Sequence, residues 1–517
     1  MDSKEWIILV LILSLSFVLF NFSNFNSNWI SHPDDQADYL FTEQYHQTGN
    51  LGIEINNVFV EAKIYPEGSV LIDSRIVPLK PVGFLILSSN FLNFGNEAVF
   101  YFVPFLGVLS LVFIFYFVKE ITSTKIALVA IALFALSIFY IAWNNMFFSN
   151  VPAFSFFILG IYSLKKYHSY KNNKSLLLLA GLFFAISFFL RYECLVFFLV
   201  IIVYFYFAKK LNIKEIILLS LPLIILVATV LLINNRLYNS PFSIGYLEEG
   251  TKENIGKENL NVFQRFYNRA LSHLIHIDSV QLGSNFVNFV INPLLGFIVI
   301  SIVGLFLLRN STKKEYITSL IIISVIWSWF VLNAQYWGFG KTFSINTYTR
   351  LLFFPYFLLA ISAATFLFKG HYNKKVSTII FLVSFLSMIT IGFYSHGGIM
   401  DVIEEKETYR LTDEYIAELP ENSVIVGNLF QKGIVSRPSI NPFLNLEKEQ
   451  RVIQTIESVN ILLSNDYEVY LIEAPWHQAT FLDLKKEFTQ GGYNVEKNHE
   501  IYIESADKVV EIYKITK

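Results

Sequence analysis

The stretch SHPDDQADYL, residues 31–40, places three aspartates beside the first apolar run of the chain. Asp34 and Asp35 are adjacent and follow a proline, and Asp38 comes three residues later. A carboxylate can act as a general base toward an acceptor group, or it can bind a metal ion. A simpler alternative is that one aspartate caps a helix, because its oxygen accepts a free backbone N–H. A cap needs only one aspartate, so the pair favours chemistry.

Residues 36–46 continue this stretch and predict a helix that lies on the membrane surface. Tyr39 contributes to the apolar face of that helix, whereas Asp38 falls on its polar face. We therefore expect Asp38 to be a residue of the polar helix face, outside the chemistry. The reactive carboxylate is expected to be Asp34 or Asp35.

A lysine that could meet a phosphate follows further along the chain. Lys80 opens the segment KPVGF, residues 80–84, just before an apolar run. The proline after it holds the lysine beside the bilayer, where its charge could bind a lipid phosphate. The alternative is a snorkelling lysine whose apolar stem covers the membrane interface. The residues alone leave both interpretations open.

Two histidines three residues apart form a second candidate site. His273 and His276 would share one face of a helix, and Asp278 follows them. This arrangement could hold zinc or manganese, although one short motif is not specific for a metal. Binding of a substrate or donor is the favoured interpretation of this segment.

The elements that must position these residues are mostly membrane spans. The chain has 517 residues, of which 54% are hydrophobic and only 15% charged, against about 25% charged in soluble proteins. Apolar runs of roughly 18–22 residues recur along the chain, the length that crosses a bilayer as a helix. The sequence therefore predicts a polytopic α-helical membrane protein. The single cysteine, Cys194, excludes an internal disulfide framework and a metal cluster held by cysteines alone.

About eleven transmembrane helices fit the hydropathy, and the loops between them alternate in charge. Basic loops fall on the same side as Lys4, whereas the opposite short loops carry almost no lysine or arginine. No small-residue cleavage site follows residues 1–20, so the first span is expected to stay uncleaved. The charge bias predicts a cytoplasmic N-terminus for a protein of the cell membrane. The predicted spans are residues 5–22, 98–118, 125–143, 148–164, 175–191, 193–208, 214–234, 286–308, 316–333, 350–368 and 376–394.

The same bias places three long segments outside the cytoplasm. They are two loops, at about 23–97 and 235–285, and the C-terminal tail. Residues 1–395 form the predicted transmembrane domain, with the candidate acids in its first outer loop. Residues 396–517 form a predicted small extracytoplasmic α/β domain, in which acidic residues outnumber basic ones.

The tail has the pattern of short strands and helices. Residues 422–428 and 467–474 are rich in β-branched and aromatic residues, which favour strands. Residues 483–492, DLKKEFTQGG, are typical of a helix that ends at glycine, and residues 507–515 favour a final strand. The glycines after the first strand lack the GxGxxG spacing of a dinucleotide site.

Four elements of the sequence resemble those of the C-type (GT-C) membrane glycosyltransferases, the superfamily of protein O-mannosyltransferases and of the lipid A aminoarabinose transferase. The early acidic motif of the superfamily is similar to Asp34 and Asp35, and its YPPG or KPPG element is similar to residues 80–84. A later GLxxGLxFLxRxE span resembles residues 181–193, and an arginine that opens a late span resembles residues 350–355. The order and predicted sidedness of these elements extend the resemblance over most of the chain.

The resemblance implies an inverting glycosyltransferase, hexosyl or pentosyl, that takes a sugar from a polyprenyl-phosphate donor. The acceptor would be a protein, a glycan or a lipid on the outer face of the membrane. Direct displacement needs a carboxylate that deprotonates or orients the acceptor hydroxyl, and positive charge on the leaving phosphate. The resemblance assigns the first role to Asp34 or Asp35, with Asp34 at the leading position of the motif. It assigns the second role to Lys80 and Arg350.

One departure from the superfamily concerns the second acid. Many relatives carry an acidic residue in the short outer loop after the third span, where this chain reads WNNMFFSN, residues 143–150. Glu97 or Asp73 could replace it, and the asparagines could bind sugar hydroxyls or a metal through their carbonyls. The residues expected to bind substrate are Tyr39, Arg191, Glu193, Asn144, Asn145, His273 and His276.

Several alternatives stay open. Arg191 and Glu193 are charged residues at the end of a predicted span, which indicates function, but a structural ion pair between helix ends is the simpler interpretation. A membrane transporter would also have many spans, although transporters usually carry their charges at the midplane in related halves. A non-catalytic envelope-assembly protein of the same fold is a further hypothesis. The expected partners are the donor, the acceptor and membrane lipid, without nucleic acid, and a divalent metal ion is one option as a cofactor.

Overall fold

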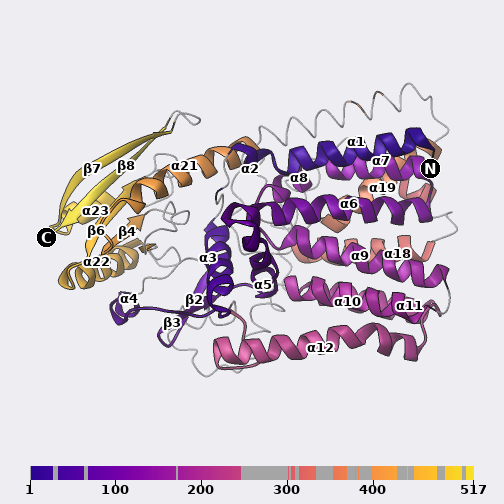
Figure 1. Cartoon of the computed structure of the whole chain (residues 1–517), viewed down its shortest axis with the longest axis horizontal. Coiled ribbons are helices and arrows are strands. Elements are labelled where there is room, and N and C mark those ends of the chain that lie inside the picture. The colour runs from indigo at the N-terminus through magenta and orange to yellow at the C-terminus, as the bar shows by residue number, and fades with distance from the viewer. Residues whose placement is uncertain are drawn as a thin grey trace. The chain divides into compact units, whose positions relative to one another are not determined.

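The computed structural model contains two compact units, each built from segments that lie far apart in the sequence (Figure 1). The helical unit comprises Met1–Phe22, Tyr101–Val230 and Phe263–Asp401, and the mixed unit comprises Ser23–Phe100, Leu231–Val262 and Val402–Lys517. The structure describes residues 2–26, 29, 33–62, 68–170, 173–245, 301, 304–308, 314–332, 353–369, 379, 382, 399–427, 439–440, 448–473, 484–503 and 508–517.

Apolar helices make up the described part of the helical unit. Three helical stretches of the described chain, Ser3–Phe20, Asn96–Ile121 and Ile213–Tyr238, are long and apolar enough to cross a membrane. Shorter apolar helices accompany them, and the chain is an integral membrane protein. The helices are α1 (Ser3–Phe20), α6 (Phe102–Ile121), α7 (Thr124–Ala135), α8 (Ile138–Asn144), α9 (Asn150–Ser169), α10 (Lys174–Leu190), α11 (Cys194–Phe207), α12 (Ile213–Tyr238), α18 (Lys314–Leu332) and α19 (Phe353–Lys369).

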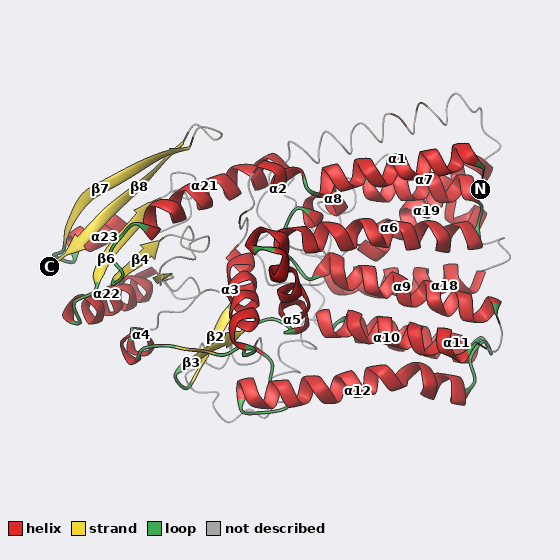
Figure 2. Cartoon of the chain, in the orientation of Figure 1, coloured by secondary structure: helices red, strands yellow, loops and turns green. Residues whose placement is uncertain are grey.

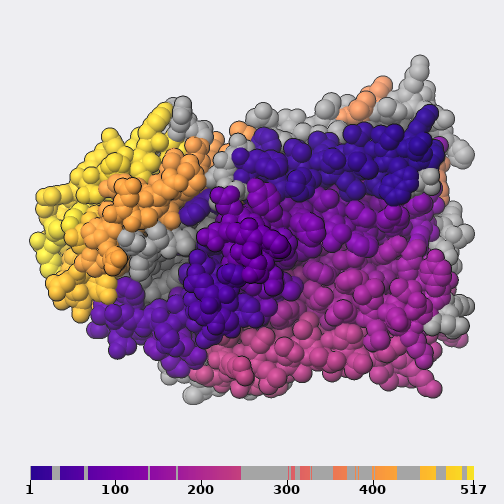
Figure 3. All heavy atoms as spheres, in the orientation of Figure 1, coloured from indigo at the N-terminus to yellow at the C-terminus, as the bar shows by residue number. Residues whose placement is uncertain are grey.

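Helix α1 carries large apolar side chains on its outer surface. Trp6, Leu11 and Val18 are all exposed, and the space-filling view shows the indigo surface of α1 on the outside of the helical unit (Figure 3). In water such a row of exposed apolar side chains would be costly, whereas lipid tails are as apolar as the side chains themselves. The surface of α1 therefore suits contact with lipid.

Aromatic rings and close backbone contacts pack the helices together. α9 packs against both α6 and α10, and α19 packs against α7 and α18. Phe154 of α9 contacts Phe134 of α7 and Phe353 of α19, with ring centroids 5.4 and 5.7 Å apart. Gly181 of α10 lies against α12, where a Cβ would come within 2.1 Å of the Leu219 carbonyl oxygen. A glycine is therefore required at this helix crossing.

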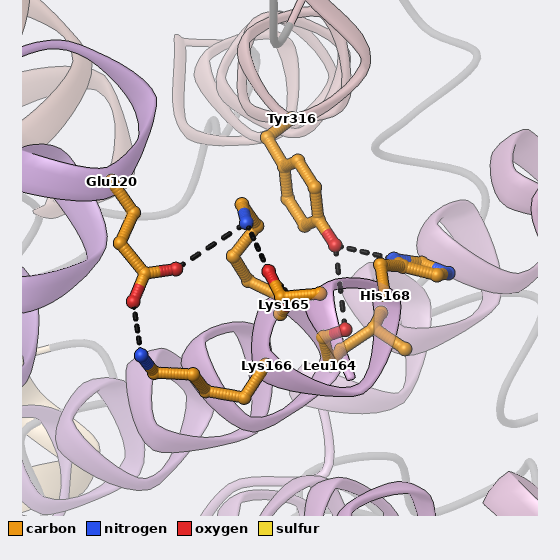
Figure 4. Close-up of polar contacts among 7 residues, drawn as sticks. Glu120, Leu164, Lys165, Lys166, His168 and Tyr316 are labelled. Carbon is orange, nitrogen blue, oxygen red and sulfur yellow. Dashed lines mark hydrogen bonds and ion pairs between the residues drawn. The ribbon is translucent and has the colours of Figure 1, made fainter. Parts of the chain in front are cut away.

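A polar network surrounds the last turn of α9 (Figure 4). Glu120 of α6 forms ion pairs with Lys165 and Lys166 of α9, and its distance to Lys165 Nζ is 3.3 Å. The ring of His168 is hydrogen-bonded to the Tyr316 hydroxyl of α18. Because the Lys165 side chain is buried, the carboxylate of Glu120 offsets a charge that would otherwise be costly. The network joins α6, α9 and α18 by polar contacts.

The predicted spans coincide with observed helices to within a few residues in the part of the chain that the structure describes. The predicted span 125–143 is instead two helices, because α7 ends at Ala135 and Ser137 caps α8 by accepting a hydrogen bond from the Tyr140 N–H. The predicted spans 286–308 and 376–394 lie largely outside the described residues.

The mixed unit contains a long helix, α3, and a small antiparallel sheet with the strand order β1-β3-β2. Asp73, with a φ of 54°, lies in the turn between β2 and β3. The elements of this part are α2 (Phe22–Asn26), α3 (Pro33–Thr48), β1 (Ile53–Glu54), α4 (Asn57–Glu61), β2 (Ser69–Ile72), β3 (Arg75–Pro78), α5 (Gly83–Ser89) and the 3-10 helices η1 (Asn90–Phe94) and η2 (Asn96–Tyr101).

A second sheet, with the order β5-β4-β6-β8-β7, forms the C-terminal part of the mixed unit (Figure 2). β4 runs parallel to β5 and β6, and β8 runs antiparallel to β6 and β7. The elements are α21 (Ile399–Ala417), β4 (Ser423–Gly427), β5 (Ser439–Ile440), α22 (Lys448–Ser464), β6 (Glu468–Glu473), α23 (Leu484–Gln490), β7 (Asn494–Ile503) and β8 (Lys508–Thr516).

Both faces of the central strands are buried. Val424 and Leu471 face a core that includes Phe488 of α23, whereas Ile425 faces a core that includes Tyr409 of α21. The alternation of β4 therefore sends successive side chains into two different cores. This explains why the strand is a continuous apolar run in the sequence.

The strands and the helix predicted in the tail are observed as β4, β6, α23 and β8. The prediction missed β7, whose residues are mostly polar and exposed because it forms the edge of the sheet. It also did not anticipate that Ala62, at the end of α4, lies in the same core as Val424. Residues of the predicted first outer loop and residues of the tail thus share one compact unit.

Candidate functional site

The first turn of α3 carries the acidic pair. Pro33 is the first residue of the helix, which suits the fixed φ of proline. Asp34 and Asp35 therefore lie in the first turn of the helix rather than at its cap. The helix dipole favours negative charge in this first turn. Asp35 is only 1% exposed, and the side chain of Asp34 lies outside the described part of the chain.

Asp38 is a buried, ion-paired residue, so the prediction that it lies on the polar face of a helix at the membrane surface is wrong. Its carboxylate lies 3.0 Å from Lys80 Nζ, and the two side chains are only 6% and 10% exposed. The reason is that the residues from Asp35 to Asp38 are all buried. Four consecutive residues cover a full helical turn, so this part of α3 is enclosed on all sides and has no solvated face.

The sequence offered Asp73 and Glu97 as a second carboxylate, but the next acid after Asp35 along α3 is Asp38. Asp73 is exposed in its turn, where it accepts a hydrogen bond from the Asn239 side chain at 3.1 Å. Glu97 lies in the first turn of η2. Asp35 and Asp38 are three residues apart on one helix, so their side chains are neighbours. A second acid therefore exists beside Asp35, on the same helix.

Lys80 is positioned by the end of strand β3. The Leu79 N–H donates to the Gly68 carbonyl at 2.9 Å, which continues the pairing with the segment before β2. The Tyr238 hydroxyl donates to the Pro78 carbonyl at 2.6 Å. Gly245 lies against Leu79 so closely that a Cβ would come within 2.4 Å of its backbone. The backbone that carries Lys80 is thus fixed from several directions.

Lys406 of α21 is a buried lysine that the sequence analysis did not single out. It is only 2% exposed, and its Nζ donates a hydrogen bond to the Asn24 side-chain oxygen. Burial lowers the pKa of Lys406 to about 7, although the negative charge of Asp35 acts in the opposite direction. The signal in the sequence was the spacing of Lys406, Tyr409 and Asp413, which share one helix face.

Tyr39, expected to bind substrate, lies partly buried on α3. Its ring stacks on Phe100 with the centroids 5.6 Å apart and the planes at 4°. Burial, followed by the charges of Glu43 and Asp413, raises the pKa of Tyr39 to about 12. The phenol therefore keeps its proton at neutral pH, so it can donate a hydrogen bond but does not act as a base.

Arg191 and Glu193 form an ion pair in the helical unit. Arg191 Nη2 lies 2.6 Å from Glu193 Oε1, and Nη1 donates to the Asn150 side-chain oxygen at 2.9 Å. Arg191 follows α10, Glu193 precedes α11 and Asn150 begins α9. These contacts link the ends of α10, α11 and α9. Substrate binding by Arg191 and Glu193 stays a prediction.

Asn144 and Asn145 are buried at the end of α8. Asn145 donates to the Leu19 carbonyl of α1 at 2.8 Å and to the Ile141 carbonyl at 2.9 Å. Asn144 fits against Gly107 of α6, where a Cβ would come within 1.8 Å of its side-chain oxygen. These contacts pack helices together, and the predicted binding of sugar by the two asparagines stays a prediction.

Three expected site residues, Arg350, His273 and His276, lie outside the described residues. Within the described ranges, no group of three His, Cys, Asp or Glu side chains is arranged to hold a metal ion. Asp38 is moreover engaged with Lys80. The described acids therefore do not form the ligand set that a divalent metal, one option as a cofactor, would need.

A known protein family matches part of the chain. Residues 80–233 match the family of dolichyl-phosphate-mannose-protein mannosyltransferases, and the match begins at Lys80. A comparison with curated protein sequences gives no match.

Solved structures resemble the chain over nearly its whole length. One is the archaeal oligosaccharyltransferase AglB from Archaeoglobus fulgidus in complex with an inhibitory peptide and a dolichol-phosphate (TM-score 0.58, 12% identity, 96% of this chain and 73% of that one). Another is ArnT from Cupriavidus metallidurans bound to undecaprenyl phosphate (TM-score 0.60, 10% identity, 99% of this chain and 98% of that one). The chain has the fold of the C-type membrane glycosyltransferases, and the predicted resemblance to that superfamily is confirmed.

Proposed function

We propose that this chain, which has the fold of the C-type membrane glycosyltransferases, transfers a sugar from a polyprenyl-phosphate donor to an acceptor hydroxyl or amide. The family match and the two structures that hold a polyprenyl phosphate support this donor class. The acceptor is a protein, a glycan or a lipid, and a peptide is bound to one of the similar structures.

The observation that carries the proposal is the juxtaposition of the acidic turn of α3 with Lys80. Asp35 and Asp38 are buried on one helix, and Lys80 Nζ lies 3.0 Å from Asp38. Glycosyl transfer from a phosphate needs a base for the acceptor and a cation for the leaving group. A buried turn that carries carboxylates beside a nearly buried ammonium supplies both groups within a short distance.

The reaction is a single displacement with inversion. The acceptor atom attacks the anomeric carbon, the bond from that carbon to the phosphate oxygen breaks, and the proton of the acceptor passes to Asp34 or Asp35. The electron pair stays on the polyprenyl phosphate, whose charge is stabilised by Lys80 and Arg350. An arginine gives bidentate contact with a phosphate, whereas a lysine is a point charge.

The ion pair with Asp38 gives Lys80 a defined position before the donor binds. The donor phosphate competes with the Asp38 carboxylate for Lys80. The lysine side chain can move from the carboxylate to the phosphate while its anchored backbone stays in place. Tyr39 keeps its proton and offers a hydrogen-bond donor to a sugar or phosphate oxygen.

We also propose the membrane topology of the chain and the side of the membrane on which the site lies. The chain has about eleven spans, a cytoplasmic N-terminus and a transmembrane domain over residues 1–395. The acidic site and the α/β domain, residues 396–517, lie outside the cytoplasm. A transporter would instead be expected to carry its acids on the membrane-spanning helices, whereas Asp35 and Asp38 lie on α3, which is not one of the apolar helices.

Loss of a product in cells tests the proposal. Cells that lack the protein are compared with cells that carry the wild type or Asp35→Asn, and their glycans and glycolipids are analysed by mass. We expect one glycan or glycolipid to lose a sugar in the deletion and to recover it with the wild type. Its absence with Asp35→Asn would assign the base to Asp35 rather than to Asp34. An unchanged set of glycans and glycolipids in the deletion strain would contradict a role in glycosyl transfer.

A further inference from the structure

Tyr238 is a buried tyrosine that the proposed reaction does not use. It is the last residue of α12 and is only 6% exposed. Its hydroxyl donates to the Pro78 carbonyl of β3 at 2.6 Å, although the two residues are 160 positions apart in the sequence. Pro78 lies two residues before Lys80, the lysine assigned to the donor phosphate. The contact therefore joins the end of α12 to the backbone that carries this lysine.

The peptide between Pro78 and Leu79 is held on both of its sides. In a trans peptide the carbonyl and the N–H point in opposite directions. The Leu79 N–H donates to the Gly68 carbonyl at 2.9 Å, on the β2 side of the strand, so the Pro78 carbonyl points toward the β1 side. The pairing of β1 with β3 ends at Ile76, and the Tyr238 hydroxyl supplies a hydrogen bond beyond that end.

The segment that follows Tyr238 makes two further contacts with the hairpin of β2 and β3. Asn239 has a φ of 57° directly after α12, and its side chain donates to Asp73 in the turn of the hairpin at 3.1 Å. Gly245 lies so close to Leu79 that a Cβ would come within 2.4 Å of the Leu79 Cα. Only a glycine allows this approach. The segment thus contacts the hairpin both at its turn and at the end that leads to the lysine.

Burial makes the hydrogen bond from Tyr238 important for the position of Lys80. Pro78 and Leu79 are both buried, and a buried carbonyl that loses a donor must turn toward another donor or toward water. Because Lys80 follows directly, such a turn would also move its Cα. The ammonium of Lys80 lies 3.0 Å from Asp38, so the side chain is oriented at its charged end and at its backbone.

We infer that Tyr238 is a positioning residue for the donor phosphate, because its hydroxyl fixes the backbone from which Lys80 reaches that phosphate. The inference rests on the proposed function, in which Lys80 stabilises the charge of the polyprenyl phosphate. A lysine is a point charge, so its attraction to a phosphate depends on the distance that its backbone allows. The end of α12 thereby gains a role in donor binding.

Binding of a polyprenyl phosphate without a sugar, the leaving group of the proposed reaction, tests this role in detergent-solubilised full-length protein. We expect Tyr238→Phe, which removes only the hydroxyl, to raise the Kd about threefold to tenfold. Lys80→Ala should raise the Kd about tenfold or more. In the Lys80→Ala background, Tyr238→Phe should change the Kd by less than about twofold, because the tyrosine acts through the lysine.

Tyr470→Phe is the matched control. Tyr470 is 4% exposed, and its hydroxyl donates to Glu468 Oε2 at 2.6 Å in the second sheet. Its loss removes a buried hydroxyl and a hydrogen bond of the same length, so it should lower the melting temperature and leave the Kd unchanged. Gly245→Ala is a second variant in case Tyr238→Phe does not fold. Its Cβ would displace the backbone of Leu79, and the Kd should rise about threefold or more.

Two results would overturn the inference alone. One is a folded Tyr238→Phe variant that binds the polyprenyl phosphate with the wild-type Kd. The other is an equal rise of the Kd in the wild-type and the Lys80→Ala backgrounds, because the tyrosine would then act independently of the lysine. The proposed donor fails in a different way. If the wild type binds no polyprenyl phosphate, the proposed donor is wrong and the inference is wrong with it.

Discussion

The ammonium of Lys80 and the carboxylate of Asp38 form an ion pair of 3.0 Å between two nearly buried side chains. The lysine comes from the end of β3 and the aspartate from the first half of α3, so the contact joins a strand to a helix 42 residues earlier in the sequence. The pair places a cation beside the carboxylates of the acidic turn.

The first prediction concerns the energy of this pair. Lys80→Met and Asp38→Asn should each lower the melting temperature, because each leaves a buried charge without the partner described here. The double variant should be more stable than the sum of the single losses predicts, with a coupling free energy of about 1–3 kcal/mol. Thermal unfolding of the four proteins in one detergent measures this coupling. Additive losses would show that the pair contributes no coupling.

The second prediction concerns the donor. Lys80→Ala should raise the KM for the polyprenyl-phosphate sugar about tenfold or more, because a charged contact to a phosphate is worth roughly 1.5–3 kcal/mol. Lys485→Ala is a control in the same unit, since that lysine lies over the Tyr513 ring in the C-terminal sheet. If both variants bind the donor equally well, Lys80 only anchors the segment at the membrane interface.

The third prediction follows from the pKa of Lys406, which burial lowers from 10.5 to about 7. Between these two values the unfolded chain binds a proton that the folded chain has lost, so the free energy of unfolding rises with pH. Below pH 7 the lysine is charged in both states and its burial penalty is fully present. Between pH 7 and 10 the melting temperature should therefore rise more in the wild type than in Lys406→Met. An equal rise in melting temperature with pH in the two proteins would contradict the lowered pKa of Lys406.

The fourth prediction separates packing from binding at Asn145. Asn145→Ala removes two hydrogen bonds to the Leu19 and Ile141 carbonyls, which should lower the free energy of unfolding by about 1–3 kcal/mol. The KM values for donor and acceptor should stay within about twofold of the wild type. A raised KM with an unchanged melting temperature would instead favour the sugar-binding role that the sequence suggested.

The membrane helices and the tail strands were predictable because their signals are local. An apolar run of sufficient length predicts a span wherever it occurs, and the run from Val424 to Val426 predicts a strand buried on both faces. The strand β7 was missed for the same reason, since an edge strand that exposes polar side chains has no apolar pattern.

The candidate site was only partly predictable because burial depends on distant segments. Nothing in the residues around Asp38 indicates that Lys80 will lie beside it, and the amphipathic pattern of α3 favoured an aspartate on a polar helix face. Lys406 lies in a polar helix, where its burial follows from the packing of Tyr409 and Ile416 on the sheet. Motif resemblance could nominate Asp34, Asp35 and Lys80 as candidate site residues, whereas the contact of Lys80 with Asp38 required the three-dimensional structure.

The fifth prediction addresses the central claim, that the acidic turn of α3 carries out the transfer. Purified wild type, Asp34→Asn, Asp35→Asn and the double variant are given a labelled polyprenyl-phosphate sugar in membranes, and label in the acceptor fraction is measured. We expect the double variant to transfer no label while it keeps the melting temperature of a folded protein, and at least one single variant to be inactive. Transfer at the wild-type rate by the double variant would contradict the account.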